Sequence, residues 1–138
     1  MLYVTYAKQK GPDNADDQSG AGNGYVDIYK PNGSLVKRFA TQGTLNSPWG
    51  IAQASSGFGL GANAILIGNF GDGRISVYDA NGNYMSQLQN DGTVIAIEGL
   101  WAIVFPQAGM GSLDPNTLYF TAAPSGEKFG IFGYLKKK

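Results

Sequence analysis

A repeat with a period near fifty residues constrains the fold of this chain more than any other feature of the sequence. Residues 25–39 align without gaps on residues 74–88, which places Tyr29 on Tyr78, 49 positions further along. In the second copy, apolar residues alternate with polar ones, as they do along a β-strand with one buried face. Both copies then contain Asn-Gly, which favours a tight hairpin turn because both residues tolerate a positive φ. Each copy therefore predicts two antiparallel strands.

Two further elements recur around these hairpins. Residues 47–52 align on residues 99–104, with Trp49 on Trp101 at a spacing of 52 residues. A short apolar strand pattern occurs three times, at residues 2–7, 65–70 and 118–123. Repeats of about fifty residues with about four strands each are typical of β-propeller blades. The sequence therefore predicts an all-β chain, a β-propeller with about three four-stranded antiparallel blades.

The repeats set the expected organisation of residues 1–138 as one propeller-like unit. Blade 1 is expected at about residues 2–39, blade 2 at about 48–88 and blade 3 at about 99–135. If the strands run outwards from the axis, the two Trp-bearing strands are innermost. The chain then lacks the innermost strand of blade 1 and the outermost strand of blade 3, and it holds ten strands. No helix is expected, because Gly and β-branched residues are frequent.

Three blades are fewer than the four or so that a closed propeller needs. An isolated arc of blades leaves two strand edges with unpaired backbone groups, and such edges favour association. Two interpretations stay open. Either two copies close a six-bladed ring as a homodimer, or the chain is a fragment of a longer propeller.

The composition excludes several kinds of site. The chain contains no Cys and no His, which removes disulfides, thiol nucleophiles and Ser-His-Asp triads. Ten basic and ten acidic residues give a net charge of zero, which argues against a nucleic-acid partner. No apolar run approaches the ~18–20 residues that span a bilayer, so no membrane insertion is expected, and no signal peptide is recognised.

Four residues are candidates for ligand binding. Trp49 and Trp101 start innermost strands, where they could stack on a sugar or an aromatic ligand, although such residues more often pack between neighbouring blades. Asn69 and Asp72 lie in a Gly-rich turn, where they either contact a ligand or stabilise the turn through its backbone. Packing and turn stabilisation are the preferred interpretations.

Asp13, Asp16 and Asp17 are candidates for a metal site in the polar loop 8–24. Calcium requires several oxygen ligands, and this loop offers them. The loop lacks the spacing of an EF-hand, however. A solvated loop is therefore the preferred interpretation, with no cofactor expected and calcium as the alternative.

The runs SPWGIA at 47–52, ILIGN at 65–69 and GRISVYD at 73–79 resemble the NHL repeat. The whole chain resembles more closely the C-terminal part of an uncharacterised bacterial family of secreted NHL-like β-propellers. That closer resemblance rests on residues 2–8, 45–50, 68–74 and 114–121. It implies an extracellular or cell-surface location and no established activity.

The expected function is that of a non-catalytic β-propeller scaffold or binding module with an unknown ligand. The absence of His and Cys favours this interpretation over an enzyme. One alternative is a calcium-dependent propeller hydrolase or lactonase, which requires acidic or amide side chains in the channel, where Glu98 is the only nearby acid. The other alternative is a structural protein that self-assembles through its open blade edges.

Overall fold

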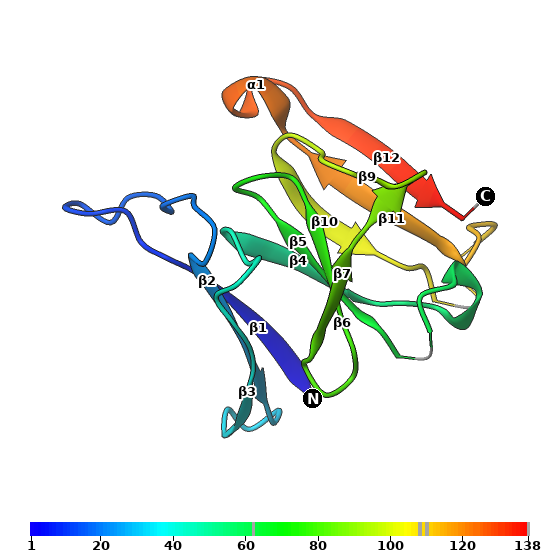
Figure 1. The fold of residues 1–138 in the computed structure, drawn as a ribbon, viewed down its shortest axis with the longest axis horizontal. Helices are drawn as coiled ribbons and strands as arrows, with labels where there is room; N and C mark the ends of the chain where they lie inside the picture. The colour runs from blue at the N-terminus through cyan, green and yellow to red at the C-terminus, as the bar shows by residue number, and fades with distance from the viewer. Residues whose placement is uncertain (62, 108, 110, 138) are drawn as a thin grey trace.

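The computed structural model describes residues 1–61, 63–107, 109 and 111–137. The described chain is all-β, with four antiparallel sheets of two to four strands, none of which closes into a barrel (Figure 1). This confirms the predicted fold class. The three larger sheets hold three, four and three strands, and in each of them the strand order follows the chain.

The first sheet contains β1 (Leu2–Ala7), β2 (Gly24–Tyr29) and β3 (Leu35–Thr41). The middle sheet contains β4 (Pro48–Gln53), β5 (Ile65–Asn69), β6 (Ile75–Tyr78) and β7 (Tyr84–Gln87). The third sheet contains β10 (Leu100–Val104), β11 (Thr117–Ala122) and β12 (Ile131–Lys136). The fourth sheet, of β8 (Gln89–Asn90) and β9 (Thr93–Val94), adds two short strands to the ten that the repeats predict.

The register of the hairpins reproduces the sequence repeat. Tyr29 lies opposite Leu35 across β2 and β3, and Tyr78 lies opposite Tyr84 across β6 and β7. In both hairpins a register shift immediately precedes the Tyr, so the irregularity repeats as well. The spacing of 49 residues between the two Tyr is therefore also the spacing of two equivalent hairpins.

The middle sheet is buried on both faces because the other two sheets pack against it. Ile65 and Ile67 of β5 belong to the core shared with the first sheet, whereas Leu66 between them belongs to the core shared with the third sheet. Alternate residues of a strand point to opposite faces, which explains this division. All the residues of β5 and β6 are buried. The first core contains Val26, Ile28, Phe39, Ala40, Leu45, Ile65, Ile67 and Tyr78.

The two Trp-bearing strands, β4 and β10, approach each other closely. Strand β4 contacts both β1 and β10. A Cβ atom placed on Gly50 would lie 2.7 Å from the carbonyl oxygen of Trp101 and 2.8 Å from the amide nitrogen of Ile103. Only glycine leaves room for this approach between β4 and the backbone of β10.

The turn between β6 and β7 forms as the sequence predicts. The Asp79 carboxylate accepts hydrogen bonds from the backbone amides of Asn81 and Asn83, and from the Asn83 side chain at 2.7 Å. These bonds, above all the one from the Asn83 side chain, lower the pKa of Asp79. Gly82 takes a φ of 97°, in the region that favours glycine.

Two short helical turns interrupt the strands, contrary to the expectation of no helix. They are the 3₁₀ turn Ser56–Phe58 and α1 (Pro124–Glu127). Within α1, Ser125 and Gly126 have left-handed dihedral angles, so this segment is a turn that reverses the chain rather than a regular helix. None of the described helices is long and apolar enough to cross a bilayer.

Residues 8–23 form a hairpin extension of the first sheet. The amide of Gln18 donates to the carbonyl of Lys8 at 2.7 Å, and the amide of Lys10 donates to the carbonyl of Asp16 at 2.9 Å. In Figure 1 this extension projects away from the sheets. Its two arms hydrogen-bond to each other, and most of its residues are exposed to solvent.

Candidate binding pocket

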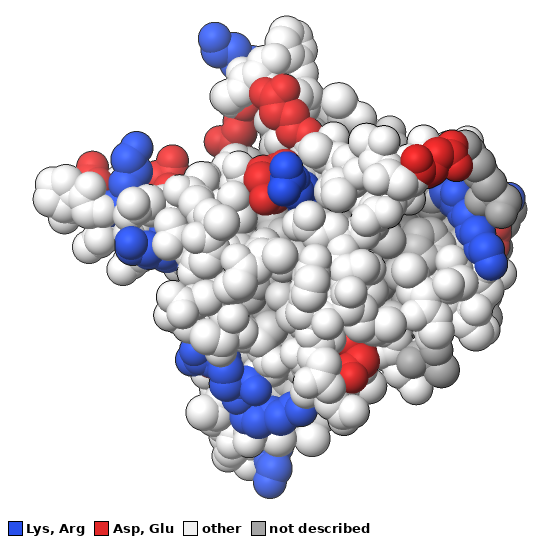
Figure 2. Space-filling view, viewed as in Figure 1, with Lys and Arg blue, Asp and Glu red and all other residues white. Residues whose placement is uncertain are grey.

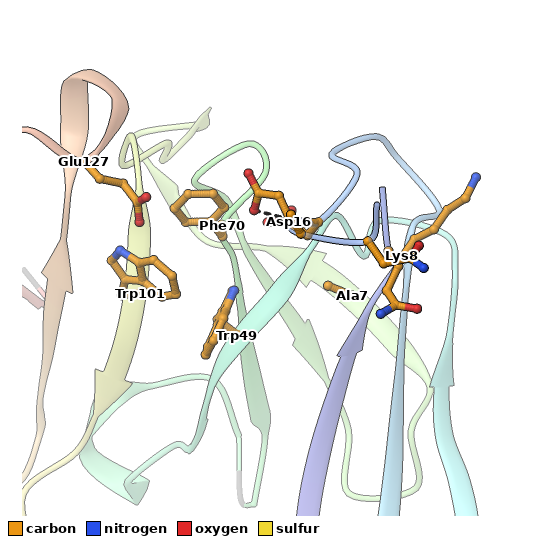
Figure 3. Close-up of a pocket in the computed structure, with 11 residues that line it drawn as sticks. Ala7, Lys8, Asp16, Trp49, Phe70, Trp101 and Glu127 are labelled. Carbon is orange, nitrogen blue, oxygen red and sulfur yellow. Dashed lines mark hydrogen bonds between the residues drawn. The ribbon is translucent and has the colours of Figure 1, made fainter. Parts of the chain in front are cut away.

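A cavity of about 330 Å³ lies beside the end of β1 and the starts of β4 and β10, one strand from each of the three larger sheets (Figure 3). Ala7 ends β1, and Trp49 and Trp101 each stand at the second position of β4 and β10. Phe70 follows the last residue of β5. The hairpin extension and α1 complete the lining. We call this cavity the aromatic pocket, after Trp49, Phe70 and Trp101.

The Trp101 ring contacts the other two aromatic rings at different inclinations. The ring centroids of Trp49 and Trp101 are 4.5 Å apart with their planes at 70°. Those of Phe70 and Trp101 are 4.8 Å apart with their planes at 42°. The Trp contact crosses from the middle sheet to the third sheet, which agrees with a packing role. Trp49 nevertheless remains 51% exposed, which is a large apolar surface to leave in water.

Three carboxylates surround the aromatic rings. Asp16 and Asp17 come from the hairpin extension, and Glu127 comes from α1. One oxygen of Asp16 accepts the backbone amide of Asp17 at 2.8 Å. The Oδ2 atom of Asp17 is buried and has no hydrogen-bond partner among the described residues.

The view in Figure 3 shows how these charges are directed. The Glu127 carboxylate lies on the Trp101 side of the pocket, and Asp16 lies beside Phe70. Lys8 is the basic residue of the lining, and its side chain extends away from the rings. Figure 2 shows the largest group of basic side chains over the end of the first sheet that carries β3. The aromatic pocket therefore has an acidic wall.

The structure brings together residues that the sequence assigned to two separate sites. Trp49 and Trp101 share one cavity with Asp16 and Asp17 of the predicted metal loop, whereas Asp13 does not line it. Sequence reasoning missed Phe70, although an aromatic side chain inside the turn run GNFGDG is unusual enough to have been a signal. It also missed Glu127, for which the sequence offers no signal, because the α1 turn alone places it.

Asn69 lies away from the aromatic pocket, in the protein interior. Its side chain is fully buried, and its Oδ1 accepts the amide of Asn46 at 3.0 Å. Its Nδ2 donates to the carbonyl of Thr44 at 3.2 Å and to Ser76 Oγ at 3.3 Å. Asn69 thus joins β5 to the connector between the first two sheets and has no surface for a ligand.

Asp72 stabilises its own turn. Its Oδ1 accepts the amide of Arg74 at 3.0 Å, two residues further along the chain. This is the local hydrogen bond by which Asp favours turns. Asp72 does not line the aromatic pocket.

The described residues include no group of three or more His, Cys, Asp or Glu placed to hold a metal ion. Asp13 Oδ1 accepts the amide of Ala15 at 3.5 Å, and Asp16 is engaged with Asp17. We therefore expect millimolar CaCl₂ to leave the melting temperature unchanged and to release no heat in a calorimetric titration of EDTA-treated protein. A melting temperature that rises with calcium concentration would contradict this, because a ligand of the folded state stabilises it by mass action.

The fold and the cavity together define an all-β chain with a solvent-open aromatic pocket. The comparisons with known proteins assign no function to this chain. Three uncharacterised proteins of Acanthamoeba polyphaga mimivirus are similar to it, 38% identical over 123 residues, 37% over 142 and 34% over 137. The alignments cover 88%, 99% and 99% of this chain but only 22%, 36% and 33% of those relatives. No protein-family model matches.

These relatives correct the family assignment made from sequence. They are viral proteins, so the resemblance to a bacterial family of NHL-like propellers was wrong. The runs that resemble the NHL repeat, at residues 47–52, 65–69 and 73–79, form β4, β5 and β6 with the turns beside them. Alternating apolar residues and Gly-rich turns follow from strand and hairpin geometry, so sheets of different families share them. The extracellular location that the resemblance implied loses its support as well.

Proposed function

We propose that this chain is a β-propeller unit that acts as a non-catalytic binding module, with the aromatic pocket as its ligand site. Three antiparallel sheets in chain order, with β4 of the middle sheet in contact with β1 and β10, support the propeller assignment. The sheets act as a rigid scaffold, and the pocket lies at the strand ends, where turns present side chains to solvent.

The half-exposed Trp49 is the observation that carries this proposal. Its ring contacts Trp101 on one side and remains 51% exposed beside a cavity of about 330 Å³. Exposed aromatic surface next to a cavity is characteristic of binding sites, because a ligand that covers it gains apolar contact. Packing between the sheets requires the ring contact but does not require the exposed face.

The lining favours binding over catalysis. It contains no hydroxyl or thiol side chain that could act as a nucleophile next to a base. Its polar groups are carboxylates, amides and one ammonium, which bind and orient a ligand.

The two tryptophans make the proposal directly testable, because they are the only two in the chain and both line the pocket. In a fragment screen by ¹H–¹⁵N NMR, we expect binding compounds to shift both indole N–H signals. Trp49→Ala should abolish the response of Trp101, whereas Met85→Ala, at an exposed apolar residue of β7 outside the pocket, should leave it unchanged. Compounds that shift only signals outside the pocket, or a screen with no response, would contradict the proposal.

We also propose that the chain associates with a second copy through the free edge of β12. Among the residues that the structure describes, the middle sheet continues from β6 to β7, whereas the third sheet has no strand paired beyond β12. This edge strand and the residues before it expose large apolar side chains, including Phe129 at 65%, Phe132 at 72% and Tyr134 at 64%. An edge strand with exposed aromatic residues favours pairing with another chain.

Light scattering over a wide concentration range tests this association. We expect a mass that approaches that of a dimer and reaches a plateau, and a monomeric mass for the double variant Phe132→Ser/Tyr134→Ser, whose replaced side chains are exposed. A monomer at every concentration would contradict self-association. A mass that rises without a plateau would replace the dimer with an open-ended assembly.

A further inference from the structure

We infer that the aromatic pocket recognises an organic cation that carries N–H donors, of the guanidinium or alkylammonium class. This inference rests on the proposed binding function and specifies its ligand. Two observations carry it: the arrangement of the rings and the charges around them.

The three aromatic rings of the pocket are inclined to one another. Trp49 and Trp101 meet at 70°, and Phe70 inclines to Trp101 at 42°, so the three do not form one flat platform. A cation is attracted to the negative face of an aromatic ring when it lies within about 6 Å of the ring centroid. Inclined rings allow one cation to contact several faces, whereas a sugar ring stacks best on a single exposed face.

The charges favour a cation over an anion or a neutral ligand. Asp16, Asp17 and Glu127 line the pocket, and Lys8, the basic lining residue, extends away from the rings. Within a partly enclosed cavity these carboxylates attract a positive group more strongly than they would in bulk water. An anionic ligand would meet like charge on two sides of the site.

The carboxylates of the lining also indicate what the cation must carry. An ionised carboxylate only accepts hydrogen bonds, so the partner that would satisfy it is a donor. Guanidinium and primary ammonium groups provide such donors together with the positive charge, whereas a quaternary ammonium provides only the charge.

The volume of the pocket fits a group of this size. At about 330 Å³ it lies at the lower end of the ~300–1,000 Å³ that is usual for small-molecule sites. A single Arg or Lys side chain, or a small free cation, fits such a space.

The test compares two probes that differ mainly in charge. Acetyl-arginine methylamide and acetyl-citrulline methylamide have nearly the same shape, and both carry N–H donors, but only the first is positive. We expect the arginine probe to shift both indole signals and to bind at least about tenfold more tightly than the citrulline probe, because the carboxylates also attract its positive charge and a tenfold difference corresponds to only about 1.4 kcal/mol. The affinity of the arginine probe should fall as salt is added, because salt screens the attraction between its charge and the carboxylates.

Variants of the carboxylates locate the effect. Asp17→Asn and Glu127→Gln, which change charge with little change of shape, should each weaken binding of the arginine probe by about tenfold. Asp13→Asn, in the same hairpin extension but outside the pocket lining, should leave the affinity unchanged. Far-UV circular dichroism of each variant checks that the fold is retained.

Several outcomes would overturn the inference and still leave the binding function testable. If the citrulline probe or methyl glucoside bound as tightly as the arginine probe, the pocket would bind ligands but would not select them by positive charge. If tetramethylammonium bound more tightly, the requirement for N–H donors would be wrong. If no probe shifted the indole signals, the cation assignment would fail, and the fragment screen would then decide whether the pocket binds any ligand.

Discussion

Replacing Asn69 with alanine is expected to lower the free energy of unfolding by about 2–4 kcal/mol. The Asn69 side chain is fully buried and accepts the amide of Asn46 while it donates to the carbonyl of Thr44. Alanine leaves both of these backbone groups without that partner, and a buried unsatisfied group costs about 1–3 kcal/mol. Thr44 Oγ1 and Ser76 Oγ, 2.9 Å apart, would keep their own hydrogen bond.

Urea unfolding followed by tryptophan fluorescence measures this loss. Asn81→Ala is the matched control, because Asn81 is an exposed turn residue that bonds to Asp79 through its backbone amide and to Lys37 through its backbone carbonyl. The control should change stability by no more than about 0.5 kcal/mol. Equal stabilities of the two variants would contradict the structural role of Asn69.

Replacing Gly50 with alanine is expected to destabilise the protein by about 1–3 kcal/mol, the usual cost of overpacking. The added methyl group would lie 2.7 Å from the carbonyl oxygen of Trp101 and 2.8 Å from the amide of Ile103. Both of these atoms belong to the backbone of β10, so no side-chain rotation relieves the contact. The inner strands must move apart, and the two indole N–H signals should shift as Trp49 separates from Trp101.

Gly130→Ala is the control for this prediction, because a Cβ atom at Gly130 meets no atom within 4 Å. That variant should keep its stability to within about 0.5 kcal/mol and should leave the indole signals in place. Unchanged stability of Gly50→Ala would mean that β4 and β10 do not approach as closely as the structure shows.

The strands and hairpins were predictable because their signals are local. Alternating apolar residues around Ile75 and Val77 specify a strand, and Asn81-Gly82 specifies the turn that follows. The repeat adds long-range information, since it places the Trp49 strand and the Trp101 strand in equivalent positions. The three larger sheets follow from these two kinds of signal.

The remaining features depend on contacts that a single sequence does not display. Residues 8–23 form a hairpin because two arms of polar residues pair through their backbones, and polarity alone predicts a solvated loop. Asn69 lies among turn-forming residues, yet its partners Thr44 and Asn46 lie more than twenty residues before it. Glu127 reaches the pocket only because the α1 turn reverses the chain.

The candidate site was accordingly predicted in part. The two tryptophans were recognised as candidates because the repeat made them equivalent, and Asp16 and Asp17 because they form an acidic cluster. That all four line one cavity depends on how the hairpin extension folds over the ends of the inner strands. Neither hydrophobic periodicity nor turn chemistry carries that information.

The central claim is that equivalent strands of two sheets bring both tryptophans into one solvent-open pocket. Nuclear Overhauser spectroscopy on labelled protein tests it most directly, because the ring centroids of Trp49 and Trp101 are 4.5 Å apart. We predict cross-peaks between the protons of the two indole rings, and between those of Trp101 and Phe70. Two indoles with no cross-peak between them would contradict the packing of β4 against β10 and, with it, the aromatic pocket.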